Sequence, residues 1–263
     1  MKIIGWNING ARSKSMNILN ADKTFNTDSH LANMLKKYKP DVVCFGETKC
    51  QDKHTALFDC LPFTHKTWIC SKGRKGYSGV CILSNKEFID RGSIPIEDND
   101  LEGRSRIVEF DDCILIYVYT PNSGGRYEYR QIWDDNVYEY LIDLHTTESK
   151  PIIYSGDLNV VNEPIDIYNK KTLLKGVTAG TLPHERQMFK GYLEYGYVDI
   201  WREKNPDVEK YTWWNYRTRA RKRNLGWRSD YFLVHEDYTD KIKDVKILDE
   251  VLGSDHCPIY IEI

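Results

Sequence analysis

The chain has 263 residues, a formal net charge of −2 and a hydrophobic fraction of 41%. This length suits one large domain or two small ones with an ample core, and the small net charge excludes a uniformly basic nucleic-acid-binding protein, so any such surface must be local. The seven cysteines form no Cys-x-x-Cys pair, which favours reduced thiols over disulfides or a zinc site. No signal peptide precedes Lys2 and no apolar run approaches the roughly 20 residues of a membrane span, so we expect a soluble intracellular protein without membrane contact.

Short apolar runs rich in Val, Ile and Tyr recur from end to end and predict β-strands. They lie at about 2–7, 42–46, 66–71, 79–84, 106–110, 113–119, 152–156, 231–234, 243–248 and 258–263. Helical periodicity predicts helices at 29–38, stopped by Pro40, and at 126–144. A further helix is expected to begin near Pro183 with Thr181 as its cap. The polar segment 13–28 is predicted to be a surface loop, and the absence of a linker predicts one α/β domain over 1–263, with two packed sheets and helices outside.

Five of these strands adjoin residues that handle metals or phosphates. The residues are Asn7, Glu47, Tyr119, the pair Asp157 and Asn159, and the pair Asp255 and His256. One such strand end would be coincidence, whereas five predict an active site.

The segment Gly156-Asp157-Leu158-Asn159 carries the clearest chemistry. Alternation along an extended chain puts Asp157 and Asn159 on one side, and the glycine allows close backbone approach. A carboxylate that deprotonates water beside an amide that holds an oxyanion suits phosphodiester hydrolysis; the alternative is a plain Asx turn. His256 follows Asp255 directly, and Asp230 could orient that imidazole.

Glu47 and Asn7 each have a functional and a structural interpretation. A carboxylate at a strand end is a natural ligand for a hard cation, but Glu47 could equally be a solvated turn residue. Asn7 taken alone is more typical of a turn cap.

The segment 211–230 is dense in aromatic and basic residues. Its six cations, Arg217, Arg219, Arg221, Lys222, Arg223 and Arg228, have no carboxylate among them before Asp230. They could follow a phosphate backbone while Trp and Tyr rings stack on sugars or bases; the alternative is a solvated loop over a tryptophan pair. A weaker basic cluster at 72–77, and Arg12, could add backbone contacts.

In this order the segments resemble the exonuclease III family of abasic-site endonucleases, within the wider endonuclease/exonuclease/phosphatase (DNase I-like) superfamily. The matching stretches are 6–10, 46–49, 75–80, 102–104, 119–122, 128–130, 156–159, 163–166, 211–214, 220–221, 224–232 and 254–258. The resemblance covers essentially the whole chain. It implies a four-layer α/β sandwich of two packed mixed β-sheets flanked by helices.

The resemblance also implies a role for each site residue. Glu47 would be the principal Mg²⁺ ligand, with Mn²⁺ as a substitute, helped by Asn7 and Asp255. Asp157 would position and deprotonate the attacking water. The residues that would hold the phosphate or the leaving group are Asn159 and His256, with Asp230 fixing His256, and Tyr119 and Asn122 in support. The pocket for a flipped sugar without its base would be formed by Trp213, Trp227 and Ser229. The residues that would contact the DNA backbone are Arg12, Gly76, Tyr77, Arg221 and Asn224. From the basic stretch, Arg217 is expected to join them.

The implied activity is Mg²⁺-dependent hydrolysis of duplex DNA on the 5′ side of abasic sites, leaving 3′-hydroxyl and 5′-deoxyribose phosphate, with 3′→5′ exonuclease and 3′-end trimming as further activities. We expect a monomer acting on DNA with abasic sites or 3′ ends, nuclear in a eukaryote or cytoplasmic in a prokaryote. A lipid or inositol phosphatase would share the catalytic groups but would not need Trp213 and Trp227. A non-catalytic DNA-binding module would need none of the catalytic groups.

Four features depart from the family pattern. Asn9 stands where many relatives carry Asp, Gly46 replaces a Gln, and Ser229 replaces an apolar residue in some relatives. The loop 13–28 is longer than usual. These departures bear on substrate preference more than on reaction type.

Overall fold

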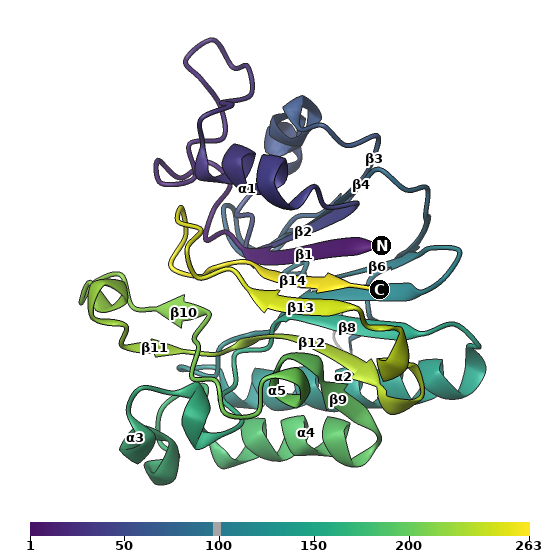
Figure 1. Ribbon diagram of the computed structural model, residues 1–263, viewed down its shortest axis with the longest axis vertical. Coiled ribbons are helices and arrows are strands. Elements are labelled where there is room, and N and C mark those ends of the chain that lie inside the picture. Colours follow the sequence, from purple (N-terminus) through teal and green to yellow (C-terminus); the bar gives the residue numbers. More distant parts are fainter. Residues whose placement is uncertain (97–100) are drawn as a thin grey trace.

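Two six-stranded β-sheets pack face to face, with helices on both outer faces (Figure 1). The computed structural model describes residues 1–96 and 101–263. One sheet has the order β13 (Asp244–Ile247), β14 (Ile259–Glu262), β1 (Lys2–Asn7), β2 (Val42–Gly46), β4 (Val80–Ser84) and β3 (His65–Ile69). The other has the order β5 (Ile89–Gly92), β6 (Ser105–Glu109), β7 (Ile114–Tyr119), β8 (Ile152–Asp157), β12 (Asp230–His235) and β9 (Tyr197–Asp199). The predicted four-layer α/β class is confirmed.

Both faces of the central strands are covered, which explains why they are apolar throughout rather than alternating. In β1, Ile3 faces the core between the sheets, whereas its neighbour Ile4 faces the outer helix layer. Gly5 leaves room for the ring of Tyr117 from the opposite sheet, because a Cβ there would lie 2.8 Å from its Cε2 atom. The two sheets therefore approach closely near the ends of β1 and β7.

The helices begin and end at recognisable signals. In α1 (His30–Tyr38), the Ser29 hydroxyl accepts from the Ala32 amide, and Lys39 adopts a left-handed conformation before Pro40. The helix α2 (Tyr127–Thr147) buries Trp133 and Val137 against the second sheet.

The expected helix near Pro183 is α4 (Pro183–Glu194), but the predicted Thr181 cap is wrong. The N-cap is Leu182, whose amide donates to the Glu185 carboxylate at 2.9 Å. The Thr181 hydroxyl instead bonds the Thr178 carbonyl.

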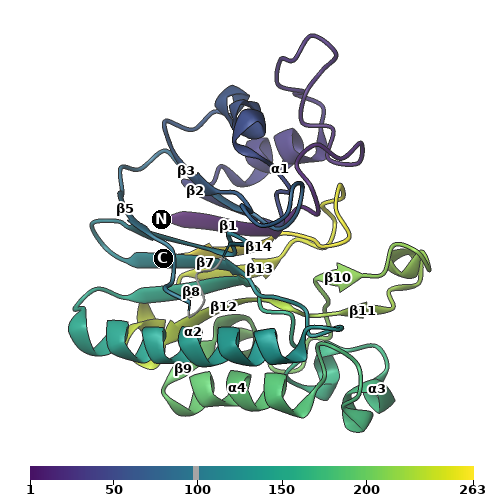
Figure 2. The ribbon, with the colours of Figure 1, turned by 180° about the vertical axis from the view of Figure 1, so that it is seen from behind.

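Several short elements were not predicted. They are the strands β5 and β9, the two-stranded ribbon of β10 (Trp213–Trp214) and β11 (Gly226–Trp227), the helices α3 (Lys170–Lys175) and α5 (Ile200–Lys204), and the 3₁₀ turns η1 (Asp52–Cys60), η2 (Pro164–Asp166), η3 (Ala220–Arg223) and η4 (Glu236–Lys241). In Figures 1 and 2, α3 and the β10–β11 ribbon project from the same end of the molecule.

The segment 13–28 forms a loop, as predicted, held by an isolated bridge between Leu19 and Phe25 and by the buried Met16 and Ile18. All seven cysteines are free thiols, and six of them are buried. Among the described residues, no helix combines the length and apolar character needed to cross a membrane.

Candidate active site

The predicted site residues meet because several strand ends converge at one edge of the two sheets. β1 and β2 run parallel, as do β7 and β8, so each pair delivers its last residues to the same edge. Tyr119, at the end of β7, lies in register with Asp157 at the end of β8. β12 runs antiparallel to β8, which places its first residue, Asp230, opposite Asp157.

A cleft of about 460 Å³ opens at this edge. Its lining includes the predicted residues Glu47, Tyr119, Asn122, Asp157, Asn159, Trp213, Trp227, Ser229, Asp255 and His256. Asn7 and Asp230 are buried behind it. Residues 178–180, after α3, also line the cleft and were not predicted; a polar loop between two helices carries no pattern that would reveal them.

Asp157 lies at the centre of the hydrogen-bond network. Its carboxylate accepts from the Asn7 side-chain amide at 3.0 Å and from the Asn159 backbone amide at 3.0 Å. Burial raises the pKa of Asp157 to about 7, against the opposing influence of the nearby His256. A carboxylate with a pKa near neutrality is well matched to accept a proton from water.

His256 is held by Asp230 and faces Asp157. Its Nδ1 lies 2.8 Å from the Asp230 carboxylate, and its Nε2 lies 3.7 Å from Asp157 Oδ2. Burial disfavours the charged ring, but the carboxylates of Asp230 and Asp157 outweigh it and raise the pKa of His256 to about 10. The two carboxylates thus favour the imidazolium form of the ring, which donates hydrogen bonds.

Asn159 is oriented from three sides. Its side-chain nitrogen donates to the Thr120 carbonyl at 2.9 Å and to Asp157 at 3.4 Å, and its oxygen accepts from Asn122 at 3.2 Å.

Tyr119 packs against the Arg104 guanidinium. Burial, and then the Glu47 carboxylate, hold the pKa of Tyr119 well above its usual range, so the phenol remains a proton donor.

Glu47 and Asp255, the predicted metal ligands, both line the cleft. The Lys49 ammonium lies 2.9 Å from Glu47 Oε1 and also donates to the Asn9 side-chain oxygen. The Asn9 amide donates to Asp255 Oδ1 at 2.9 Å, so Asn9 links the two carboxylates through Lys49. Carboxylate oxygens are the ligands that a hard divalent cation such as Mg²⁺ prefers.

Asn7 is turned toward Asp157 rather than toward those two carboxylates. Its amide nitrogen donates to Asp157, and its oxygen accepts from the Asn9 backbone amide at 3.1 Å. If Asn7 also bound the metal ion, its side-chain oxygen would have to contact both the ion and the Asn9 amide.

The backbone is strained at several site residues. Asn9, Glu47, Lys49 and Asn159 all adopt positive φ values, between 46° and 52°. Left-handed conformations are uncommon for residues other than glycine, least so for Asn, and cluster where function requires them. Glu47 and Lys49 are thus aimed by an unfavourable turn that the surrounding fold maintains.

One wall of the cleft is aromatic. The rings of Trp213 and Trp227 meet edge to face at 5.6 Å, and the Trp213 indole donates to Asp255 Oδ2 at 3.2 Å. Gly180 packs beneath Trp227, where a Cβ would lie 3.0 Å from the ring. The two tryptophans are the only members of the 211–230 segment, apart from Asn215 and Ser229, that line the cleft.

The other predicted DNA contacts lie outside the cleft. Arg12 donates to the Lys49 carbonyl at 3.3 Å, and the Tyr77 hydroxyl accepts from Arg104 and Arg126. Gly76 has a left-handed φ of 66°. Arg217 is exposed on the turn between β10 and β11.

Three residues of the 211–230 segment that were expected to contact DNA bond instead to other parts of the protein. Arg221 donates to the carbonyls of Ser254, Asp249 and Val251. Asn224 accepts from the Trp214 indole. Arg228 is fully buried and pairs with Asp166 and Asp199, so the interpretation of this cation as a backbone contact is wrong. Charge patterns alone cannot reveal a carboxylate partner 62 residues earlier in the chain.

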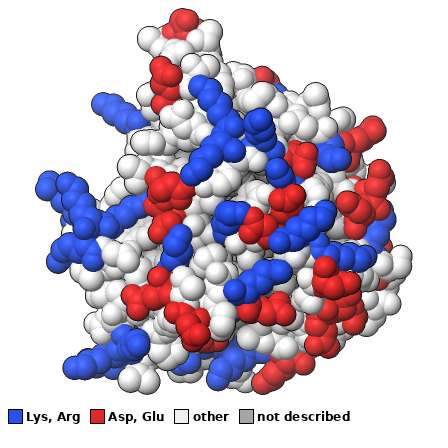
Figure 3. Space-filling model, in the orientation of Figure 1, with Lys and Arg blue, Asp and Glu red and all other residues white. Residues whose placement is uncertain are grey.

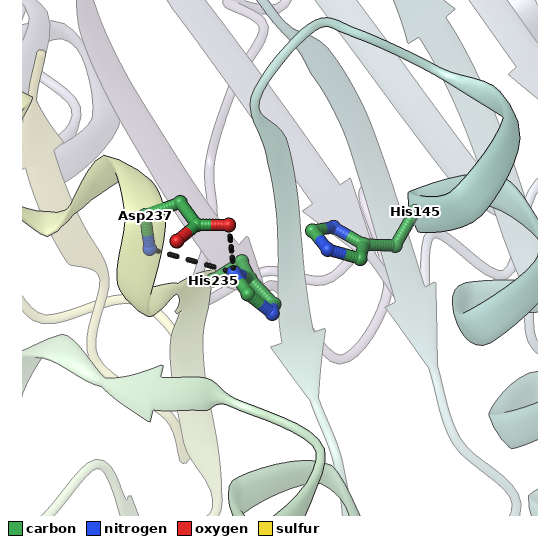
Figure 4. A group of neighbouring side chains, drawn as sticks. All are labelled: His145, His235 and Asp237. Carbon is green, nitrogen blue, oxygen red and sulfur yellow. Dashed lines mark hydrogen bonds and ion pairs between the residues drawn. The ribbon is translucent and has the colours of Figure 1, made fainter.

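The ligand atoms of Asp157, Asp230 and His256 lie close enough together to hold a metal ion. So do those of a second group, His145, His235 and Asp237, at the far end of β12 (Figure 4). His235 ends the strand that Asp230 begins. The rings of His145 and His235 stack at 3.8 Å with planes 22° apart. Lone pairs in the planes of stacked rings run side by side and do not converge on one ion, so this arrangement is better explained by packing.

Two packed sheets, with carboxylates, amides and an imidazole at their common edge, define a hydrolase of the phosphoesterase type. The model of the Endonuclease/Exonuclease/phosphatase family matches residues 4–256, and the chain belongs to that family. The sequence is 38% identical to the exodeoxyribonuclease of Bacillus subtilis, over 100% of this chain and 99% of the relative.

Two further proteins resemble this chain over almost its whole length. The DNA repair nuclease APEX1 of Danio rerio is 37% identical over 99% of this chain and 81% of its own length. The AP endonuclease LMAP of Leishmania major superposes with a TM-score of 0.81 at 30% identity, covering 99% of this chain and 86% of that one. The resemblance to exonuclease III-type abasic-site endonucleases is confirmed, and the chain is an enzyme of the DNA-repair nuclease group.

Proposed function

We propose that this chain is a Mg²⁺-dependent nuclease that cleaves duplex DNA on the 5′ side of abasic sites, leaving 3′-hydroxyl and 5′-deoxyribose phosphate ends, and that it also trims 3′ ends. It would act as a single-domain monomer wherever the cell keeps its DNA. The observation that carries the proposal is that Asp157, Asn159 and His256 share one cleft with Trp213 and Trp227. The first three suit phosphodiester hydrolysis, and the tryptophan wall suits a sugar that lacks its base.

In the proposed mechanism, Asp157 orients a water molecule and accepts its proton as the water oxygen bonds to phosphorus and the P–O3′ bond breaks. The O3′ leaving oxygen takes a proton from solvent and becomes the 3′-hydroxyl. Its raised pKa and its fixed hydrogen bonds to Asn7 and Asn159 support this role. The His256 imidazolium donates to a non-bridging phosphate oxygen, where negative charge builds up in the transition state. The Asn159 amide does the same once it releases its long 3.4 Å hydrogen bond to Asp157. Asp230 keeps His256 charged and oriented.

Glu47 and Asp255 would hold the Mg²⁺ ion, with Asn7 in support. When bound, the ion would neutralise charge on the phosphate and on the leaving oxygen. Lys49 would have to release Glu47 for this to happen, since its ammonium now faces that carboxylate. Tyr119 and Asn122 would steady the phosphate beside Asn159.

On the DNA side, Trp213, Trp227 and Ser229 would enclose the flipped sugar. Arg217, Arg12, Gly76 and Tyr77 would face the backbone. For Arg221 and Asn224 we propose a supporting role, because their side chains hold the 249–254 loop and Trp214.

The test is a panel of duplexes carrying an abasic site, a 3′-recessed end, a 3′-phosphate or no lesion, each incubated with Mg²⁺, with Mn²⁺ or with EDTA. We expect a nick 5′ to the abasic site with either metal and none with EDTA. Tight binding without cleavage in every condition would support a binding module instead. Release of phosphate from phosphoinositides, with no cleavage of DNA, would favour a phosphatase.

A further inference from the structure

The α3 segment, residues 168–178, exposes apolar side chains beside the cleft. Leu174 is 81% exposed and Val177 is 74% exposed. Of the nine exposed large apolar side chains in the described part of the chain, four lie on this segment or on the β10–β11 turn: Tyr168, Leu174, Val177 and Tyr216. Single exposed apolar residues are ordinary, but a group at one end of a molecule indicates a contact surface.

The segment is fixed to the cleft wall. Ile167 forms a bridge with Trp227, and the Tyr168 amide donates to the Gly226 carbonyl at 3.1 Å. Immediately after Val177, residues 178–180 line the cleft itself. Leu174 and Val177, which we call the apolar tip, are therefore held at the rim of the proposed sugar pocket. The ribbon that holds them is the one that carries Trp213 and Trp227.

The surroundings of this tip are basic. Residues 168–178 include Lys170, Lys171 and Lys175 and no acidic residue, and all three lysines are exposed. A hollow of about 340 Å³ beside α3 is lined by Lys175, Arg186 and Lys190. Figure 3 shows Lys and Arg gathered at the left edge and at the lower left, where the ribbon and α3 lie in Figure 1. Duplex DNA has negatively charged phosphates outside and an apolar stack of bases inside. The lysines could contact the phosphates, and the apolar tip could contact the bases.

We propose that Leu174 and Val177 form a wedge that enters duplex DNA next to the abasic site, while Lys170, Lys171 and Lys175 contact the phosphates on either side. Apolar wedges open base steps at the expense of stacking energy. That cost is least where a base is already missing, so the wedge would favour abasic over intact duplex. This inference rests on the proposed function, and it assigns part of the lesion preference to a segment outside the catalytic cleft.

The experiment compares the double variant L174S/V177S with the wild type in EDTA, so that no cleavage occurs. Fluorescence anisotropy measures the Kd for a duplex with a tetrahydrofuran abasic analogue and for the same duplex intact. We expect about a tenfold weaker Kd for the abasic duplex and a change of less than about twofold for the intact one. The matched control is Ile89→Ser, an apolar residue 65% exposed on β5, which should bind both duplexes as the wild type does.

A second variant separates the wedge from the lysines. K170A/K171A should weaken both duplexes equally and reduce the slope of log Kd against log salt by about two. Equal losses on both duplexes for L174S/V177S, or unchanged binding, would overturn the wedge. A wild-type protein that binds the two duplexes equally would contradict the proposed function as well, whereas a preference that survives in the double variant would overturn the wedge alone.

Discussion

At the scale of single residues, the proposed mechanism depends on two groups of opposite character. Asp157 has a pKa raised to about 7 mainly by burial, and His256 has a pKa raised to about 10 by its two carboxylate neighbours. In the proposed mechanism the Asp157 carboxylate therefore accepts the proton, and the His256 ring donates hydrogen bonds. We do not expect Asp255 and His256 to form one acid–base couple, because Asp255 bonds to Asn9 and Trp213 whereas His256 bonds to Asp230.

The substitution Asp157→Asn should abolish incision while leaving DNA binding almost unchanged. The amide keeps the shape of the side chain but cannot accept a proton, and loss of a general base typically costs on the order of 10²- to 10⁴-fold in rate. Single-turnover cleavage of an abasic duplex gives the rate, and anisotropy in EDTA gives the affinity. A variant that still cleaves at the wild-type rate would remove Asp157 from the role of base.

The substitution Asp230→Asn should lower the pKa of His256. The imidazolium is favoured by the anion 2.8 Å from Nδ1, so removing that charge stabilises the neutral ring and moves the titration down from about 10. We expect a fall of more than about one unit in an NMR titration of the metal-free protein. The Ser229→Ala variant is the comparison, because it removes only a 3.4 Å hydrogen bond to the Asp230 carboxylate and keeps its charge, so it should shift the pKa of His256 far less. An unchanged pKa in D230N would assign the shift to other groups.

At the scale of elements, the sequence is most informative where strands are long and doubly buried. The ten predicted strands are all present, because apolar runs with both faces covered leave little alternative. β5 was missed because its first three residues are exposed. β10 and β11 were missed because two-residue strands have no periodicity and exist only through each other.

The same reasoning explains which site residues could be predicted. Residues directly following or preceding apolar strands could be located, because strand ends of two packed sheets share an edge. The bridging roles of Asn9 and Lys49, and the cleft wall at 178–180, depend on loop geometry that no local pattern encodes.

Gly156, near the end of β8, packs closely against the backbone of β7. Gly156 has a φ of 134°, and a Cβ there would lie 2.0 Å from the Val118 carbonyl oxygen of the neighbouring strand. Gly156→Ala should therefore cost more than about 4 kcal/mol or prevent folding. Gly92→Ala is the matched control: its φ is 86°, but no described atom lies within 4 Å, so only backbone strain of about 1 kcal/mol is expected. Urea denaturation distinguishes them, and similar losses in both variants would exclude the clash.

At the scale of the whole molecule, one buried ion network ties distant segments beneath the aromatic wall. Arg228 lies between Asp166 and Asp199, at 2.7 Å and 2.6 Å, and Arg202 also pairs with Asp166. Buried ion pairs therefore link η2, β9, α5 and the end of the 211–230 segment. Trp227, which precedes Arg228, is positioned by this network.

Arg228→Met should reduce the free energy of unfolding by about 3–5 kcal/mol, because it leaves two buried carboxylates with one arginine. Chemical denaturation measures the change. Arg217→Met, which alters an exposed cation of the same segment, should stay within about 0.5 kcal/mol of the wild type. Comparable stabilities for the two variants would show that the network contributes little.

The burial of the cysteines, taken over the whole molecule, has a consequence for its chemical durability. Only Cys60 is partly accessible among the seven, and burial raises the pKa of every one of these thiols. Since the thiolate is the species that electrophiles and peroxide attack, the folded protein offers almost none at neutral pH. Treatment with N-ethylmaleimide should add one label at most by intact-mass spectrometry and leave incision unchanged, whereas several adducts on the folded protein would contradict the burial. A nuclease built this way could keep working under the same oxidative stress that damages its substrate.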